Sequence, residues 1–226
     1  MTPPADPVAA RWAAVRARVA AAAERAGRDP AAVRIVAATK TVPAERLAAL
    51  VAAGCVDLGE NRAQELLAKA PGRPDVTWHF IGHLQRNKAK DVVLARATVE
   101  TVDSERLATE LDKRAGAAGV PVPVLVQVNV AREPQKSGCD PDAVAALIAH
   151  VRSLSGLELR GLMTIPPHDD DPERIRPHFS ALRALRARHL DPGAWLSMGM
   201  SADLEVAVAE GATHVRVGTA IFGARN

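Results

Sequence analysis

The chain has 226 residues, 48% of them hydrophobic, which is enough for one large domain with a substantial core. Its formal net charge is +3 and its charged residues are scattered, so we expect no nucleic-acid partner. It contains no tyrosine, which excludes tyrosine acid catalysts, and two distant cysteines that indicate neither a disulfide framework nor a zinc site. We therefore expect a soluble, cytoplasmic protein with no metal and no membrane contact.

In chain order, short apolar runs rich in β-formers alternate with longer Ala-, Leu- and Arg-rich stretches of helical period. A leading helix is predicted near residues 9–26. Eight strands are predicted after it, at 33–38, 56–59, 78–82, 98–102, 122–130, 157–164, 195–198 and 214–217. Helix starts between the strands are indicated by Pro43, Ser104, Asp140-Pro141, Asp171-Pro172 and Ser201.

Eight strands, each followed by its own helix or, at the end, by a short turn near Ile221, are typical of a parallel sheet with crossover helices. The count predicts a single α/β domain over residues 1–226, a (β/α)8 TIM-type barrel with an extra N-terminal helix. The alternative is an open doubly wound sheet. No GxGxxG follows a strand, so the dinucleotide-binding version of that alternative lacks its phosphate loop.

Lys40 lies at the C-terminal end of the first predicted strand, on the side of the barrel where catalytic groups lie in this architecture. The period of two places Lys40 on one face with Val36 and Ala38, so it is expected at the barrel mouth. A lysine at a strand end often only reaches solvent. To act as a nucleophile near pH 7 it must lose roughly 5 kcal/mol of preference for its proton, which burial or a neighbouring cation supplies.

Arg216 in the eighth strand is such a cation, because strands one and eight are neighbours in a closed barrel. The alternative is that Arg216 pairs with a structural carboxylate inside the barrel. Free backbone N–H groups at Gly218 and Thr219, with Ser201 at a helix start, suit a phosphate between the loops after strands seven and eight. Acidic residues at 203 and 205 oppose this unless they point away.

A lysine on strand one, an arginine on strand eight and a phosphate cradle resemble the barrel of fold-type III pyridoxal 5′-phosphate (PLP) enzymes such as alanine racemase. The chain is similar, in particular, to the pyridoxal phosphate homeostasis protein family (YggS/PROSC), from about residue 33 to residue 223. The segments that carry the resemblance are 38–41 (ATKT), 59–61 (GEN), 78–88 (WHFIGHLQRNK), 136–138 (KSG), 161–166 (GLMTIP), 197–203 (SMGMSAD) and 215–223 (VRVGTAIFG).

The resemblance implies that Lys40 forms a Schiff base with PLP and that Arg216 faces the pyridine nitrogen. It implies further that Ser201, Gly218 and Thr219 hold the phosphate. Asn61, Asn129 and Met163 end strands two, five and six, so we expect them to line the pocket, with simple packing as the alternative for Met163.

An arginine does not give up its proton, so a ring nitrogen facing it stays unprotonated and the ring is a weak electron sink. The resembling racemases also take their second base, a tyrosine, from a β-rich domain that we do not expect here. We therefore expect a monomeric, non-catalytic carrier that buffers PLP for vitamin B6 homeostasis and passes it to apo PLP-dependent enzymes. The alternative is an amino-acid racemase or decarboxylase.

Other side chains near the predicted mouth keep that alternative open, since they could move a proton. They are His83, His168 and Cys139, although solvated loop histidines and a small apolar cysteine are the more ordinary interpretations. Lys136, in the Lys-Ser-Gly loop, is a second amine that could accept the aldehyde in transit, or simply a solvated lysine.

Overall fold

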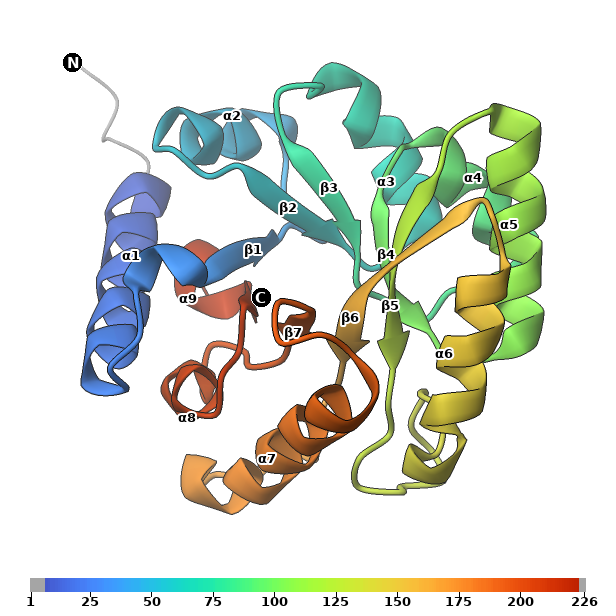
Figure 1. The fold of residues 1–226 in the computed structure, drawn as a ribbon. Coiled ribbons are helices and arrows are strands. Elements are labelled where there is room, and N and C mark those ends of the chain that lie inside the picture. Colours follow the sequence, from blue (N-terminus) through green and yellow to red (C-terminus); the bar gives the residue numbers. More distant parts are fainter. Residues whose placement is uncertain (1–6, 224–226) are drawn as a thin grey trace.

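A computed structural model of the chain describes residues 7–223 and shows eight parallel strands closed into a barrel in sequential order (Figure 1). β1 pairs in parallel with both β2 and β8, which closes the ring. The predicted fold class is therefore confirmed. The strands are β1 (Arg34–Ala38), β2 (Asp57–Glu60), β3 (Thr77–Phe80), β4 (Thr98–Val102), β5 (Val122–Gln127), β6 (Leu157–Met163), β7 (Trp195–Ser197) and β8 (His214–Val217).

Helices surround this barrel, and within residues 7–223 none is long and apolar enough to cross a lipid bilayer (Figure 1). The α-helices are α1 (Pro7–Arg25), α2 (Ala44–Ala52), α3 (Ala63–Lys69), α4 (Ala89–Leu94), α5 (Glu105–Ala118), α6 (Val144–Ser153), α7 (Pro172–His189), α8 (Leu204–Ala209) and α9 (Thr219–Phe222). Short 3-10 turns are η1 (Pro30–Ala32), η2 (Ala70–Gly72), η3 (Arg86–Lys88) and η4 (Pro141–Ala143).

The period-two alternation of each strand separates a helix-facing side from an inward side. In β8, Val215 and Val217 join the apolar core between sheet and helices, while Arg216 is buried outside that core. Alternate residues of β3 behave in the same way, with Trp78 and His79 on opposite sides. The barrel interior therefore holds polar side chains as well as apolar ones.

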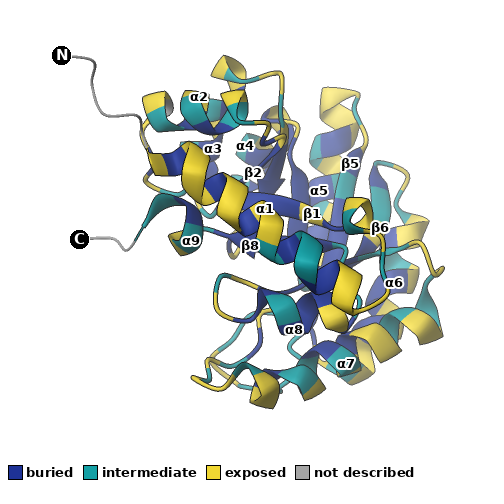
Figure 2. Cartoon of the chain, turned by 90° about the vertical axis from the view of Figure 1, so that its left-hand side faces the viewer, coloured by how far each residue is buried: buried dark blue, intermediate teal, exposed yellow. Residues whose placement is uncertain are grey.

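The leading helix α1 packs across the outside of the barrel against α8, α9 and α2. Its buried residues recur every three or four positions, and the opposite face is exposed (Figure 2). Trp12 on the buried face donates its indole N–H to Ala53 O at 3.1 Å. This helix thus ties the start of the chain to the elements that flank β1 and β8.

Several predicted boundaries differ from the structure by one to three residues, and two of them lie beside predicted site residues. The fifth strand ends at Gln127 rather than at residue 130, because Asn129 turns the chain by exchanging hydrogen bonds with Glu133. The helix predicted to start at Ser201 begins at Leu204, because the carboxylate of Asp203 accepts the N–H of Met200 and closes a turn before it. Ser104 and Asp171 cap their helices through their side chains as predicted.

Candidate functional site

Lys40 lies two residues beyond β1, at the C-terminal end of the barrel strands, and is half-buried. Its amine makes no hydrogen bond or ion pair within the described residues 7–223. Val36 is level with Arg216 of β8 across the strand pair, so the Lys40 backbone lies four residues nearer the mouth than Arg216. The structure therefore places Lys40 just beyond β1, nearer the mouth than Arg216 on the neighbouring strand β8.

The backbone that carries Lys40 is held by a buried ion pair between Glu60 and Lys69. The Thr39 hydroxyl donates to Glu60 Oε1 at 2.7 Å, and Lys69 Nζ donates to the same oxygen at 2.6 Å and to Thr39 O at 3.0 Å. Thr41, the next residue, has φ of 61° and donates its N–H to Glu65 Oε2 at 2.9 Å. Residues of β2 and α3 therefore fix the direction in which the chain leaves β1.

Burial raises the pKa of Glu60, and its hydrogen bonds to Lys69 and Thr39 oppose that rise. Glu60 is fully buried, and its Oε2 atom has no hydrogen-bond partner. The carboxylate therefore depends on Lys69 for its charge compensation.

Arg216 is 5% exposed and donates two hydrogen bonds inside the barrel. Its Nη1 donates to Ser197 Oγ at 2.7 Å and its Nη2 to Thr164 O at 2.8 Å. Burial lowers the pKa of Arg216, but an arginine side chain stays protonated in proteins. Its partners are thus a hydroxyl and a carbonyl rather than a directly paired carboxylate.

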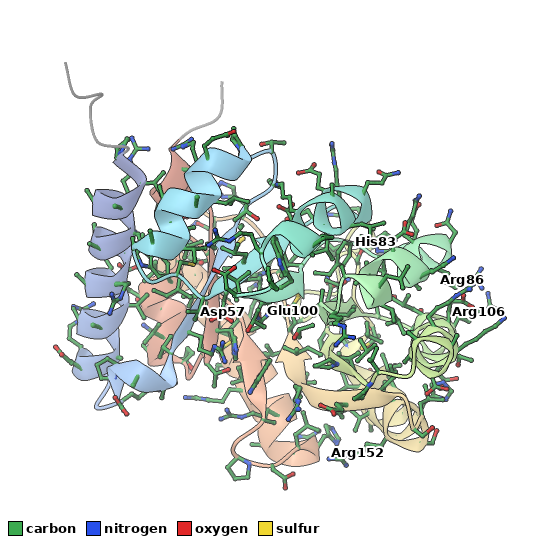
Figure 3. The ribbon with its side chains drawn as sticks, turned by 90° about the horizontal axis from the view of Figure 1, so that it is seen from above. Asp57, His83, Arg86, Glu100, Arg106 and Arg152 are labelled. Carbon is green, nitrogen blue, oxygen red and sulfur yellow. The ribbon has the colours of Figure 1, made fainter. Side chains whose placement is uncertain are left out.

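A carboxylate, that of Glu100, is connected to Arg216 through the Ser197 hydroxyl. The Ser197 hydroxyl donates to Glu100 Oε2 at 2.5 Å, and Glu100 Oε1 lies 2.7 Å from His79 Nδ1. His79 Nε2 is 3.1 Å from Asp57 Oδ1, and Arg34 donates to Asp57 through Nε and Nη2. Asp57 and Glu100 appear in the middle of the molecule in Figure 3, whereas Arg86, Arg106 and Arg152 lie at its periphery.

The contacts between His79 and its two carboxylate neighbours keep these buried groups charged. Burial alone would lower the pKa of His79, but its hydrogen bonds to Asp57 and Glu100 raise that pKa to about 9. Burial would likewise raise the pKa of Glu100, but the bond to His79 lowers it to about 2. His214, which stacks on Trp195, behaves differently, because burial lowers its pKa to about 4 and leaves it neutral.

Ser201, Gly218 and Thr219 meet where the loop after β7 and the start of α9 come together. The Ser201 hydroxyl accepts the Ala220 N–H at 3.3 Å, which ties the two segments. Within residues 7–223, four backbone N–H groups here donate to no acceptor, those of Ser201, Ala202, Gly218 and Thr219. We call these four N–H groups with the Ser201 and Thr219 hydroxyls the amide cradle.

The acidic residues beside the amide cradle are bonded to other protein groups. Asp203 is 3% exposed and accepts the Met200 N–H at 2.5 Å. Glu205 pairs with Arg18 of α1, at 2.8 Å to Nε and 3.0 Å to Nη2. The two carboxylates that, from the sequence, were expected to oppose a bound phosphate therefore already have partners within the protein.

Asn61 and Met163 lie in different surroundings. Asn61 lines a cavity of about 290 Å³ at the mouth, together with Lys136 and His83. Met163 is fully buried, level with Gln127 and Ser197 of the neighbouring strands, so it forms part of the barrel interior.

The remaining candidates at the mouth are tied to protein groups. Lys136 Nζ donates to Pro166 O at 2.9 Å and lies 3.0 Å from Glu133 Oε1. His83 is 3.1 Å from the Ser137 hydroxyl. Burial raises the pKa of the Cys139 thiol to about 12, so it is not a nucleophile at neutral pH. Asn129 bonds to its own loop instead of lining the cavity.

From the sequence, we did not identify the polar residues of the barrel interior. Asp57, His79 and Glu100 come from three strands, and each stands at an inward position of its strand. For His79 the signal was available, because a titratable residue lies there between two apolar core residues, Trp78 and Phe80. Among the described residues, no group of three such side chains is arranged to hold a metal ion.

The sequence matches the family described as alanine racemase, N-terminal domain, over residues 11–226. It is 45% identical over 224 residues to the pyridoxal phosphate homeostasis protein of Pseudomonas aeruginosa, covering 97% of this chain and 96% of that protein. The protein of the same name from Escherichia coli is 40% identical over 230 residues, with 97% of each chain covered.

Solved structures agree. The PipY protein of Synechococcus elongatus, with PLP bound, is 36% identical with a TM-score of 0.81, covering 96% of this chain and 100% of that one. An alanine racemase of Streptomyces coelicolor is 25% identical with a TM-score of 0.72, and the match covers 95% of this chain but 59% of the racemase. The chain belongs to the pyridoxal phosphate homeostasis protein family and shares its barrel with the N-terminal domain of alanine racemases.

Proposed function

We propose that this protein binds PLP reversibly, shelters its aldehyde and releases it, and so supports vitamin B6 homeostasis. The observation that carries the proposal is the meeting of three features at one end of the barrel: the free amine of Lys40, the buried guanidinium of Arg216 and the amide cradle. The relatives named for PLP homeostasis and the PLP-bound PipY support it.

The residues fit the cofactor. A phosphate needs several hydrogen-bond donors, and the amide cradle offers four unpaired N–H groups, while the neighbouring carboxylates of Asp203 and Glu205 bond to Met200 N–H and Arg18. An aldehyde needs an uncommitted amine, which Lys40 provides. The fit therefore rests on donors that have no partner in the described part of the protein.

Each group would have one task. Bound PLP supplies an aldehyde that condenses with a lysine amine, and Lys40 would be the anchor. Ser201, Gly218 and Thr219 would hold the phosphate, and Arg216 would face the ring nitrogen. Asn61 and Met163 would form walls beside the ring, Met163 from the barrel interior.

A carrier fits these residues better than an enzyme. Arg216 keeps its proton, so it would leave the ring nitrogen unprotonated and the ring a weak electron sink. The sequence contains no tyrosine to serve as a second base, and the Cys139 thiol is held protonated. We therefore propose that the protein does not turn over amino acids.

The setting of this function is also proposed. Both cysteines are buried and unpaired, which suits a reducing cytoplasm. We propose that residues 1–226 work as one monomeric PLP-binding domain, with apo PLP-dependent enzymes as the recipients of the cofactor.

Titration with PLP, followed by absorbance, tests the binding proposal. The wild-type protein is expected to develop the visible band of lysine-bound PLP. Lys40→Ala should lose this band and bind at least about tenfold more weakly, whereas Lys113→Ala, on the exposed face of α5, should match the wild type. Equal binding and an equal band in Lys40→Ala would refute Lys40 as the anchor.

A second experiment separates the carrier from the enzyme. The PLP-loaded protein is incubated with a panel of amino acids, and chirality and carbon dioxide release are followed. We expect rates no greater than those of free PLP. Clear turnover would restore the racemase or decarboxylase alternative.

A further inference from the structure

The hydrogen bonds below Arg216 have only one possible direction. A guanidinium only donates, so Ser197 Oγ must accept from Arg216 Nη1. The single hydroxyl proton of Ser197 is then free to go to Glu100 Oε2, 2.5 Å away. Exchanging these roles would leave a donor facing a donor. The position of Arg216 is thus coupled to that of Glu100 through one hydroxyl.

The orientation of Glu100 is set in turn by His79. Both ring nitrogens of His79 face carboxylates, Nδ1 towards Glu100 at 2.7 Å and Nε2 towards Asp57 at 3.1 Å. Two acceptors require two N–H donors, so the ring is an imidazolium. Glu100 is fully buried and His79 has no measurable exposure, so neither is able to exchange its partner for water.

The charges of the interior alternate along this path. Arg216 is followed by the anion Glu100, the cation His79 and the anion Asp57, which ends on the half-exposed Arg34. Arg34 and Asp57 begin β1 and β2, so the path runs from the N-terminal end of the barrel towards its mouth. The charged groups that act on Arg216 are Glu100 and, from the loop before α8, Asp203.

Removing Glu100 therefore has two consequences for Arg216. Ser197 loses the acceptor that fixes the direction of its hydroxyl. The Ser197 oxygen is then no longer held in the orientation that accepts the hydrogen bond from Arg216 Nη1. The guanidinium also loses one of the two anions that act on it, inside a barrel with low dielectric, where such an interaction is strong. Both consequences change where the guanidinium rests and not whether it is charged.

We propose that Glu100, oriented by His79 and acting through Ser197, is a positioning residue that holds the Arg216 guanidinium against the ring of bound cofactor. This inference rests on the proposed function, since it takes Arg216 as a cofactor contact. It extends that function by placing control of the ring-facing group at the opposite side of the barrel. Neither Glu100 nor His79 is required to touch the cofactor.

Glu100→Gln and Ser197→Ala test this inference, alone and combined. Each single variant is expected to weaken PLP binding about tenfold and to shift the visible absorption maximum of the bound cofactor in the same direction. The double variant should bind about as weakly as either single one, because Glu100→Gln removes the charge at one end of the link and Ser197→Ala removes the hydroxyl that connects this charge to Arg216. Glu210→Gln is the matched control, since Glu210 is 8% exposed and pairs with Arg176 and Arg183 instead.

Thermal unfolding of the cofactor-free proteins shows whether each variant folds. If Glu100→Gln does not fold, Ser197→Ala carries the test by itself. Wild-type affinity and an unshifted spectrum in a folded Ser197→Ala protein would overturn the inference, as would effects that multiply in the double variant. Absence of PLP binding in the wild type would instead refute the proposed function, and the inference with it.

Discussion

His79 is a histidine whose charge is set by its neighbours rather than by the pH of the cell. It lies between Asp57 and Glu100, and those contacts raise its pKa from 6.5 to about 9 despite its burial. The same contact lowers the pKa of Glu100 to about 2. An ion pair of this kind is stable only while both partners keep their charge.

The stability of the protein should therefore depend on pH on the alkaline side. His79 has a higher pKa in the folded state than the 6.5 of the unfolded chain, so its contribution is complete below pH 6.5 and is lost as pH rises through 9. A loss of about 3 kcal/mol in the free energy of unfolding is expected across this interval. Urea unfolding at pH 6.5 and at pH 9 measures it.

On the acid side the sign is reversed. Glu100 has a lowered pKa when folded, so its stabilisation is present above pH 4.5 and is lost as pH falls towards 2.

For the alkaline experiment His79→Gln is the control, because this variant should lose less stability between pH 6.5 and pH 9 than the wild type does. A wild-type protein equally stable at pH 6.5 and 9 would contradict the charged pair.

Lys69 has a different role, because it compensates a carboxylate beneath the Lys40 segment. Lys69→Met leaves Glu60 buried without a cation and should lower the free energy of unfolding by about 3 kcal/mol. Adding Glu60→Gln should recover much of this loss. Arg132→Met, in an exposed pair with Asp140, should leave chemical denaturation almost unchanged. Equal effects of Lys69→Met and Arg132→Met would count against the buried pair.

Among the elements, the loop from β7 to α8 contains a tight turn beside the amide cradle. Gly199 has φ of 95°, and a Cβ added there would lie 2.4 Å from Ala207 Cβ. The Gly199 carbonyl also accepts the N–H of Arg216. A glycine is therefore needed for the loop to bring Ser201 towards Gly218.

Gly199→Ala should lower the free energy of unfolding by about 2 kcal/mol and weaken PLP binding, because the loop has to shift to admit the methyl group. Gly193→Ala, in the connection before β7, is the control. Its backbone φ is not left-handed, and a Cβ there would meet nothing within 4 Å. Denaturant unfolding and PLP titration of both variants provide the comparison. Wild-type behaviour of Gly199→Ala would disprove this reading of the loop.

At the scale of the whole molecule, the barrel closes by pairing residues 34–37 with 214–217, in the first and last strands. Helix α1 reinforces this closure, since Arg18 bonds to Glu205 and to Ser201 O. Arg28, just beyond α1, donates to Val208 O and Ala212 O. The site therefore forms only when β1 has paired with β8.

Much of this architecture could be predicted from the sequence. Strand β8 was found at its observed bounds because its valines alternate with His214 and Arg216, and α5 because Ser104 caps it. Strand β5 was predicted too long, since Asn129 turns the chain through a side-chain bond that periodicity does not reveal. Local sequence patterns thus predicted which elements form more accurately than the residues at which those elements end.

The site was harder to predict, for a physical reason. Lys40 and Arg216 could be identified as site candidates once the barrel fold was predicted, because they lie at or near strand ends on its functional side. The connection of Arg216 to Glu100 could not be predicted in this way. It passes through the hydroxyl of Ser197, which is 97 positions away from Glu100 in the sequence. Such contacts depend on which inward side chains the closed barrel brings together.

The most direct test of the whole account is borohydride reduction of the wild-type protein after incubation with PLP, followed by peptide mapping. Reduction makes the bond between cofactor and amine permanent, so the modified residue is identified by its mass. We predict a pyridoxyl adduct on Lys40. An adduct on another lysine such as Lys136, or none at all, would contradict the central claim.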